Sequence, residues 1–223
     1  MEKSAIFLGM KITFISDAGS WKNGAILGLV RKLRKKRHKV SFVHASAAVP
    51  RGELLFILGF FKILPTAVLK RNKTNLVVHE SALPKGRGWS PVTWAILEGA
   101  RAIPLTLFEA VEKVDAGKIY LRDKVRLKGH ELLPEIQVKV SEKMVQVCER
   151  FIRNYPGILK RGVSQRGRAT YYSRRRPEDS RLNPNQPIAK QFNFLRSVNN
   201  DVYPAYFTWR GQTYTLKIEK KKN

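Results

Sequence analysis

Short apolar runs along the chain alternate with longer stretches in which apolar residues recur every three or four positions. Residues 11–16 and 40–44 read as two strands. Between them, residues 20–37 carry an apolar stripe at helical spacing, with Lys and Arg on the other face. The members of that stripe are Ile26, Leu29, Val30 and Leu33. A β-α-β opening of this kind predicts a parallel sheet with a right-handed crossover.

The middle of the chain continues this alternation. Residues 54–58 form a continuous apolar run, which suits a central strand covered on both faces. Further strands are expected at 75–78, 103–109 and 118–125. Helical segments are expected at 66–73, at 92–98, and from Gly129 to about Asn154. The predicted fold class is α/β, with a Rossmann-like core and a mostly parallel sheet. The opening unit lacks G-x-G-x-x-G, so nothing supports a dinucleotide site.

The composition changes after Tyr155-Pro-Gly157, and we divide the chain there into a core, residues 1–158, and a C-terminal region, residues 159–223. Residues 160–181 are dense in Arg, Gly and Ser, which indicates a linker or an extended arm. A helix is expected within 186–198. Two strands should follow, 205–209 and 214–218, joined by Arg-Gly-Gln as a small β-hairpin.

Charge sets this chain apart from an ordinary globular protein. It carries 43 Lys and Arg against 17 Asp and Glu, a net charge of +26. Such an excess attracts any polyanion, including nucleic acid, phosphorylated small molecules and acidic membrane surfaces. The basic residues are spread over many clusters, so solvated basic faces are an equal alternative to a binding surface.

Other features exclude several classes of protein. No run approaches the roughly 18 apolar residues of a membrane helix, and no secretory signal pattern opens the chain. We therefore expect a cytoplasmic protein that does not contact a membrane. The single cysteine, Cys148, excludes an internal disulfide and a multi-cysteine metal site, and its helical surroundings predict a packing role. No bound metal is expected.

The candidate chemistry centres on His79. This histidine follows the apolar strand 75–78 and precedes a loop, 80–91, that Pro and Gly interrupt. Ligands bind at that edge of open α/β sheets. Asp115 lies on a later turn, from which it could orient His79 or stabilise its charge. A lone histidine at a strand end is more often structural, so the hypothesis of an active site depends on the loop and Asp115 as well.

Two motifs start at these residues: H-x-S-x-L-P at His79 and D-x-G-x-I at Asp115. As a pair they resemble the formyltransferase family that uses N10-formyltetrahydrofolate. The segments HESALPKGRGWSP, W-x-I-L-E-G and I-P-x-T-L-F-E-A are similar to the bacterial branch that formylates nucleotide-linked 4-amino-4,6-dideoxy sugars. The tail segments YYSRRRPEDSRLNPN, KQFNFLR and YPAYFTWRGQTYTLKI resemble the same branch, including pseudaminic-acid-pathway relatives. The resemblance spans nearly the whole chain and implies a Rossmann-like core with a small β-containing appendage.

This resemblance implies transfer of a formyl group to the 4-amine of a UDP- or dTDP-linked sugar, in the biosynthesis of lipopolysaccharide or another surface glycan. His79 would handle the proton and help to stabilise the oxyanion, and Asp115 would orient His79 and maintain its charge. The wider family has N-x-H, but Val77 stands in place of that Asn. Asn75 is a lesser catalytic candidate. Backbone N–H groups, a water or His79 itself are the alternatives for holding the formyl oxygen.

The resemblance also implies binding residues. Residues 59–65 resemble a wall of the folate pocket, with ordinary core packing as the alternative. The expected cofactor-binding residues are Gly59, Phe60, Phe61, Leu64, Ser81, Leu83 and Gly117. Lys85 and Arg87 are candidates for binding the pyrophosphate. The alternative is that they lie on a solvated loop without a ligand. The expected nucleotide-binding residues of the tail are Phe192, Asn193, Arg196, Tyr206 and Phe207, with packing of the hairpin as the equal alternative.

Two other interpretations stay open. A methionyl-tRNA formyltransferase would suit the charge, although the region after residue 158 is short for the tRNA-binding domain of that family. A basic nucleic-acid-binding protein without catalysis is favoured by Val77, whereas His79 and Asp115 oppose it. Pairing of two copies through the edge of the C-terminal hairpin is a further open alternative.

Overall fold

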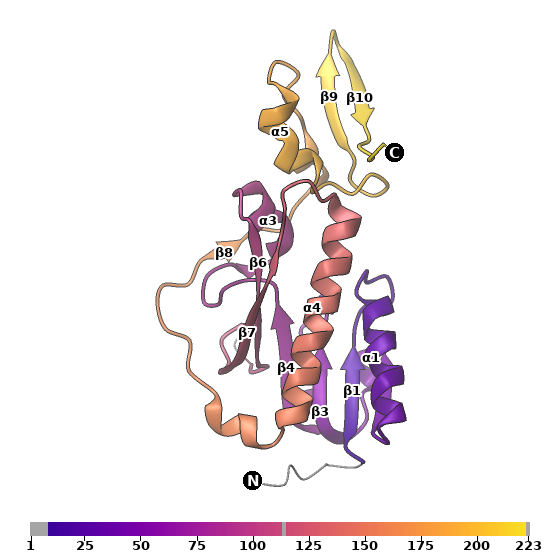
Figure 1. Cartoon of the computed structure of the whole chain (residues 1–223), viewed down its shortest axis with the longest axis vertical. Helices are drawn as coiled ribbons and strands as arrows, with labels where there is room; N and C mark the ends of the chain where they lie inside the picture. The colour runs from indigo at the N-terminus through magenta and orange to yellow at the C-terminus, as the bar shows by residue number, and fades with distance from the viewer. Residues whose placement is uncertain (1–8, 113–114, 222–223) are drawn as a thin grey trace.

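A six-stranded sheet forms the centre of the computed structural model, which describes residues 9–112 and 115–221 (Figure 1). The strand order is β2-β1-β3-β4-β6-β7. The first four are parallel: β1 (Lys11–Ile15), β2 (Lys39–Val43), β3 (Gly52–Ile57) and β4 (Asn72–His79). An antiparallel hairpin of β6 (Ala102–Glu109) and β7 (Ile119–Arg126) extends the sheet beside β4. The predicted α/β fold is confirmed.

Two helices, α1 (Asn23–Lys35) and α4 (Leu133–Asn154), cover one face of the sheet. Their apolar sides join the strands in the largest core cluster. The predicted stripe of α1 is buried there, and so is Cys148, whose thiol pKa is raised by burial. The helix α4 begins later than the expected Gly129, because Glu135 accepts the backbone N–H of Leu132 and so fixes the first turn.

The opposite face carries a smaller cluster beneath α2 (Thr66–Leu69). This helix is shorter than the predicted segment 66–73, because β4 already pairs with β3 from Asn72 onward. The helix α3 (Pro91–Leu97) follows the loop after β4. The remaining short elements of this part are η1 (Ser46–Ala48), β5 (Arg87–Gly88) and η2 (Gly157–Arg161).

The segment predicted as a linker or arm folds back onto the core. Val163 forms a bridge with Ile119 of β7, and β8 (Tyr171–Tyr172) pairs in parallel with β5. Figure 1 shows this segment rising from the lower end of α4 past β7 to β8. The arm therefore supplies neighbours to the loop that follows His79.

A small C-terminal unit stands beyond α3 and the start of α4 (Figure 1). It contains η3 (Pro177–Ser180), α5 (Ile188–Leu195), β9 (Ala205–Trp209) and β10 (Gln212–Leu216), around a core of its own. The predicted hairpin is present, but β10 begins two residues before the expected 214. The turn takes only Arg210 and Gly211, with φ of 48° and 79°, as in a tight two-residue hairpin.

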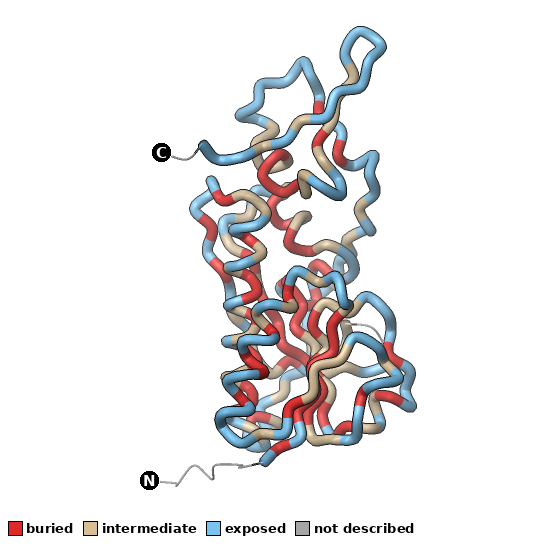
Figure 2. The backbone as a smooth tube through the Cα atoms, turned by 90° about the vertical axis from the view of Figure 1, so that its right-hand side faces the viewer, coloured by how far each residue is buried: buried red, intermediate tan, exposed pale blue. Residues whose placement is uncertain are grey.

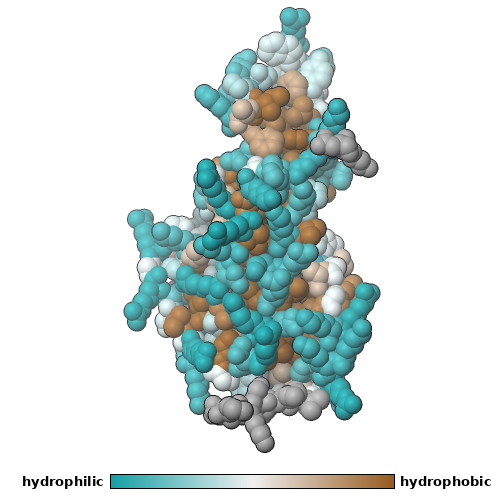
Figure 3. Space-filling view, viewed as in Figure 1, coloured by the Kyte–Doolittle hydropathy of each residue, from teal (hydrophilic) through white to brown (hydrophobic). Residues whose placement is uncertain are grey.

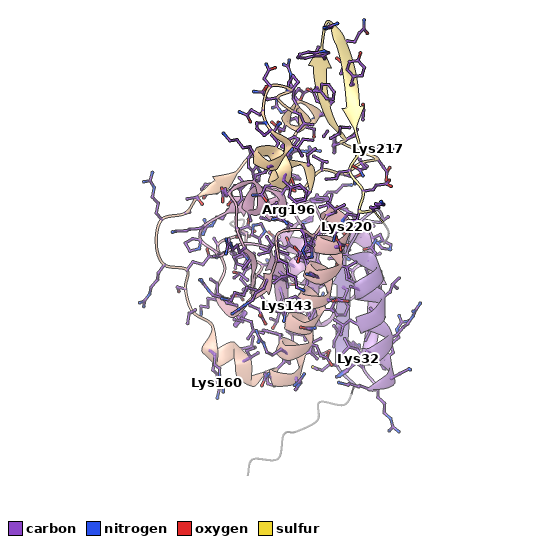
Figure 4. All side chains as sticks on the ribbon, turned by 45° about the horizontal axis from the view of Figure 1, so that its top comes forward. Lys32, Lys143, Lys160, Arg196, Lys217 and Lys220 are labelled. Carbon is purple, nitrogen blue, oxygen red and sulfur yellow. The ribbon has the colours of Figure 1, made fainter. Side chains whose placement is uncertain are left out.

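Buried and charged residues have different distributions. Figure 2 shows buried residues concentrated along the sheet and the helix sides that face it, whereas the tip of the C-terminal hairpin is exposed. Figure 3 shows an apolar area on the C-terminal unit above a body covered largely by hydrophilic side chains. The labels in Figure 4 mark Lys32 of α1, Lys160 of η2 and Lys217 beside the hairpin. Across the described ranges, we find no helix with the length and apolar content that a membrane span requires.

Candidate active site

A pocket of about 460 Å³ opens at the carboxyl edge of the parallel strands. That volume is typical of sites for small molecules, which run from about 300 to 1,000 Å³. The lining combines apolar and polar side chains. The apolar part, called the apolar wall below, contains Ile57, Phe60, Leu64, Leu69, Val77, Phe108 and Val111, and the polar part contains Lys22, Lys62, His79, Glu80, Ser90 and Asp115.

His79 occupies the end of β4 with only 9% of its surface exposed. Its Nε2 lies 2.8 Å from the carbonyl oxygen of Gly86. Because a carbonyl oxygen can only accept a hydrogen bond, we assign the proton to Nε2. Nδ1 is then the ring atom that can take a proton from a ligand.

Gly86 can hold His79 because the arm fixes the loop from behind. The backbone N–H of Gly86 donates to Thr170 Oγ1 at 2.8 Å, and Arg87 N donates to the Thr170 carbonyl at 2.9 Å. Gly86 has φ of 71°, and a Cβ there would lie 2.8 Å from the Tyr172 ring. Glycine is therefore required for both the turn and the close approach of the arm.

Asp115 lines the same pocket as His79, so the structure brings the two predicted catalytic residues together. Asp115 Oδ2 accepts a long hydrogen bond of 3.4 Å from Gly88 N, and the Asp115 carbonyl accepts one of 2.7 Å from Gln165. Both predicted residues thus hold the loop at Gly86–Gly88. Within the described part of the chain no hydrogen bond joins Asp115 to His79, so the orienting role of Asp115 stays a prediction.

Asn75, the lesser candidate, does not line the pocket. Its side-chain Nδ2 donates to the carbonyl of Leu69, at the end of α2, at 3.0 Å. Val77 packs instead with Leu83 and Phe108 in a small apolar cluster. The strand position that carries Asn in the wider family thus contributes only apolar surface here.

The predicted cofactor-binding residues separate into two groups. Gly59, Phe60, Phe61 and Leu64 line the pocket, and the exposed ring of Phe61 stacks on Trp89 at 5.7 Å. The other group, Ser81, Leu83 and Gly117, does not line it. Ser81 accepts a hydrogen bond from Thr106 at 2.6 Å, Leu83 is fully buried, and Gly117 lies against the Glu109 carbonyl. These three shape the loops behind the pocket.

The loop residues predicted to bind a pyrophosphate lie outside this pocket. Arg87 is 8% exposed, donates to Gln165 at 2.7 Å and lies over the Tyr171 ring at 6.0 Å, so it anchors the arm. Lys85 is exposed in a separate hollow, which Trp94 and residues 170–173 also line. Trp94 stacks on Tyr172 at 5.9 Å, so it packs the arm against α3.

The predicted nucleotide-binding residues of the tail belong to the C-terminal unit and do not line the pocket of His79. Asn193 and Arg196 line a second cavity of about 510 Å³ with Arg101 and Lys128. Arg196 is 2% exposed, and burial lowers the pKa of its guanidinium. Figure 4 shows Arg196 at the junction of the core and the C-terminal unit. The other three are half-buried: Phe192 on α5, and Tyr206 with Phe207 on β9, where Phe207 stacks on Tyr214 at 5.5 Å.

Sequence reasoning missed four residues around the site. Lys22 and Glu80 form a buried ion pair in the pocket lining. Thr170 and Gln165 of the arm contact the loop after His79 at Gly86 and Arg87, and Gln165 also donates to the Asp115 carbonyl. The only signal for Glu80 was its place beside His79. The arm gave no signal, because its composition is typical of a linker.

The fold and the pocket define an open α/β protein with a histidine and an aspartate in a ligand site at the carboxyl edge of its sheet. The model of the formyl transferase family matches residues 12–152. The chain therefore belongs to the formyl transferase family, as its motifs predicted.

Known proteins of several kinds are similar to this chain. A methionyl-tRNA formyltransferase of Mycoplasma capricolum is 23% identical over 185 residues, which are 82% of this chain and 58% of that protein. The chain thus spans little more than half the length of this curated relative.

Three solved structures share the fold. A methionyl-tRNA formyltransferase from Clostridium thermocellum has a TM-score of 0.77 at 19% identity, over 96% of this chain and 94% of that one. A 4-N formyltransferase from Francisella tularensis has a TM-score of 0.68 at 15% identity, over 96% and 99%. HypX from Aquifex aeolicus, in complex with tetrahydrofolic acid, has a TM-score of 0.71 at 21% identity, over 94% and 37%.

Proposed function

We propose that this chain transfers the formyl group of N10-formyltetrahydrofolate to the 4-amine of a nucleotide-linked 4-amino-4,6-dideoxy sugar. The observation that carries the proposal is the pocket, which places His79 and Asp115 beside an apolar wall at the ligand-binding edge of the sheet. Family membership gives the reaction class. The chemistry of the acceptor rests on the sequence motifs.

The residues present fit a folate. A flat, largely aromatic ring system needs an apolar slot with a few polar groups at its end. Phe60, Leu64 and Phe108 offer that slot, and His79 and Asp115 supply the polar end. The donor supplies an activated formyl carbon, and these side chains would hold it next to the imidazole.

The exchange moves the formyl carbon from N10 to the acceptor nitrogen, and one hydrogen from that nitrogen to N10. His79 Nδ1 takes the proton of the attacking amine and returns it to the leaving nitrogen. The bond from Nε2 to Gly86 fixes the ring for that exchange. Asp115 adds a carboxylate to the same pocket and is tied through Gly88 to the loop that holds the imidazole.

A sugar nucleotide is the acceptor that the motifs favour. The segment from His79 to Pro91 resembles the sugar-modifying branch, and the 4-N formyltransferase from Francisella tularensis aligns over nearly its whole length with this chain. Methionyl-tRNA is the second candidate. The similarity to the Clostridium thermocellum enzyme and the net charge of +26 favour it.

Calorimetric titration distinguishes these acceptors. The protein is titrated with a stable analogue of N10-formyltetrahydrofolate, alone and then with UDP- or dTDP-linked 4-amino-4,6-dideoxy sugars. We expect the folate analogue to bind and one sugar nucleotide to tighten that binding. Absence of folate binding would overturn the proposal and would favour a nucleic-acid-binding role. Formylation of methionyl-tRNA but of no sugar nucleotide would transfer the proposal to the second acceptor.

A further inference from the structure

The polar side of the pocket contains an ion pair that the proposed chemistry does not use. Lys22 Nζ contacts Glu80 Oε1, and each side chain is only 7% exposed. Lys22 precedes the first turn of α1, and Glu80 directly follows His79 at the end of β4. Among the described residues, no other ion pair has both partners this deeply buried.

Such a pair has no evident structural purpose. Removing two charges from water costs free energy that their attraction often fails to repay, so a buried pair is weak evidence for stability. The hydrogen bonds of this pair are also incomplete. Glu80 Oε2 has no partner among the described residues, and Lys22 Nζ uses one of its three hydrogens. Both side chains line the pocket, so a ligand can bind the Glu80 oxygen and the Lys22 hydrogens that this pair leaves without a partner.

The ion pair begins at the residue directly after the proposed catalytic histidine. Successive side chains of a strand point to opposite faces. Val78 faces the core under α1 and α4, whereas Val77 packs in the cluster of Phe108 on the other face. His79, two positions after Val77, ends the strand, and Glu80 is the next residue. Both side chains line the pocket, so the Glu80 carboxylate is available to a ligand that meets the imidazole.

Gly59 brings this arrangement close together. A Cβ on Gly59 would lie 2.7 Å from Ser20 Oγ and 3.0 Å from Lys22 Cδ, so only glycine lets the end of β3 approach the stem of Lys22. Gly59, which itself lines the pocket, is thus the residue against which the Lys22 side chain packs.

We propose that Glu80 binds the amine of the acceptor and that Lys22 holds the Glu80 carboxylate in position for it. This inference rests on the proposed function and identifies Glu80 as the group that binds the amine of the acceptor. An alkyl amine arrives largely as an ammonium ion, and a carboxylate is its strongest hydrogen-bonding partner. A chain with a net charge of +26 repels such a cation, so its site needs a local anion. Glu80 takes no part in the covalent exchange: the bound ammonium ion releases one proton to solvent to become the attacking amine, and His79 moves the second from that nitrogen to N10.

The decisive variant removes both charges. Glu80→Gln alone would leave Lys22 buried without a partner, and that variant could be too unstable to assay. The double variant Lys22→Met/Glu80→Gln should fold, because it removes both charges and leaves neither of them buried without its partner. The matched control is Lys32→Met/Glu149→Gln, the same exchange at a pair between α1 and α4 in which Lys32 is exposed and Glu149 is half-buried (Lys32 is labelled in Figure 4).

Steady-state formyl transfer to dTDP-4-amino-4,6-dideoxyglucose and to its UDP counterpart is measured for wild type and variants. Inhibition by the same nucleotides with a 4-hydroxyl group is measured alongside. In the Lys22/Glu80 double variant we expect the acceptor KM to rise roughly 10- to 100-fold, the loss typical of a hydrogen bond to a charged group. The preference of the enzyme for nucleotides with a 4-amine over those with a 4-hydroxyl group should disappear. Affinity for the folate analogue and the melting temperature should stay close to wild type, and the control should match wild type throughout.

A double variant that keeps the wild-type KM and amine preference would overturn this proposal and leave the proposed function intact. A wild-type protein that formylates neither probe would overturn the sugar acceptor, and the role of Glu80 with it. A double variant that loses folate affinity and acceptor affinity together would show that the pair maintains the whole pocket, which also contradicts an amine-binding role.

Discussion

His79 owes its place in the site to a backbone carbonyl. The family motifs suggested that a carboxylate orients the imidazole, but the hydrogen bond of Nε2 goes to Gly86, and Asp115 contacts the neighbouring Gly88. In the proposed mechanism the two residues therefore have separable contributions: His79 supplies the proton-transferring atom, whereas Asp115 supplies charge and a tie to the loop.

Replacing these residues one at a time should separate the two roles. His79→Ala is expected to lower kcat by about 10² to 10⁴, the usual contribution of general acid–base catalysis. Asp115→Asn should lower it less. Asn is the right replacement because Asp115 has φ of 53°, a conformation that Asn also tolerates. Initial rates of formyl transfer, with melting temperatures as the check on folding, measure both. Near-normal turnover by His79→Ala would show that the proposed mechanism is wrong.

Gly117 should prove necessary for stability although it does not line the pocket. A Cβ there would collide with the carbonyl oxygen of Glu109, where β6 ends. Gly117→Ala is expected to cost roughly 1–3 kcal/mol in the free energy of unfolding, the range for overpacking a filled site.

The matched control for this change is Gly28→Ala, in an exposed and open position of α1. It should stabilise the protein by about 0.5–1 kcal/mol, because alanine favours a helix interior. Urea denaturation measures both changes. Equal effects of the two substitutions would refute the steric reason.

The arm after α4 is part of the candidate site rather than a spacer. Its strand β8 pairs with β5, Thr170 accepts the backbone N–H of Gly86 in the histidine loop, and Gln165 donates to the backbone carbonyl of Asp115. Residues beyond the predicted boundary at 158 thus support the pocket of the core. The boundary itself stays a prediction, since the C-terminal unit from η3 onward has its own core.

The entry to α4 contains a buried carboxylate that should make stability depend on pH. Burial by itself would raise the pKa of Glu131, but hydrogen bonds from Lys128 N, Lys139 and Gly129 N lower it well below the usual 4.5. A carboxyl group with a lowered pKa in the folded state stabilises that state above the unfolded pKa and loses this contribution as pH falls. Arg196 also donates to the Glu131 carbonyl, so the group lies at the junction with the C-terminal unit.

Glu131→Gln should therefore lower the melting temperature by a few degrees at pH 7. The difference from wild type should shrink as pH falls below about 4.5, toward the lowered pKa of the folded state. Glu142→Gln, at an exposed position of α4, is the control and should show no such trend. Melting curves between pH 7 and pH 3 measure the difference, and a gap that does not change with pH would contradict this assignment.

The whole molecule combines a strongly basic surface with a pocket that contains carboxylates. Its net charge is +26, yet Glu80 and Asp115 line the pocket beside His79. Because basic residues extend over both the core and the C-terminal unit, the charge is a property of the entire surface (Figure 4). The surface therefore favours polyanions in general, whereas the pocket lining contains charges of both signs, Lys22 and Lys62 with Glu80 and Asp115.

Salt should separate surface charge from pocket chemistry. Raising NaCl from 20 to 300 mM is expected to raise the melting temperature, because screening weakens repulsion among surface charges. The same change should weaken retention on heparin or bulk RNA steeply. His79→Ala is the control, since it leaves the surface charge unchanged and should respond like wild type. A melting temperature that falls with salt would contradict the view that like-charge repulsion limits stability.

The sequence by itself determined the alternation of strands and helices, the parallel sheet and the family. Periodicity encodes these features locally, as the buried stripe of α1 and the apolar run in β3 show. It also identified His79 and Asp115 as candidate catalytic residues, because each belongs to a motif that is contiguous in sequence.

Only the tertiary structure decided which other residues meet at the pocket. Lys22 and Glu80 are 58 positions apart, and Thr170 lies 84 positions after Gly86. No periodicity connects residues at such separations, since their contact depends on how the sheet edge, the start of α1 and the arm pack together. For the same reason Arg196 lies at a second cavity although its segment resembles a nucleotide-binding tail. Local patterns specify elements, whereas long-range packing assembles the site.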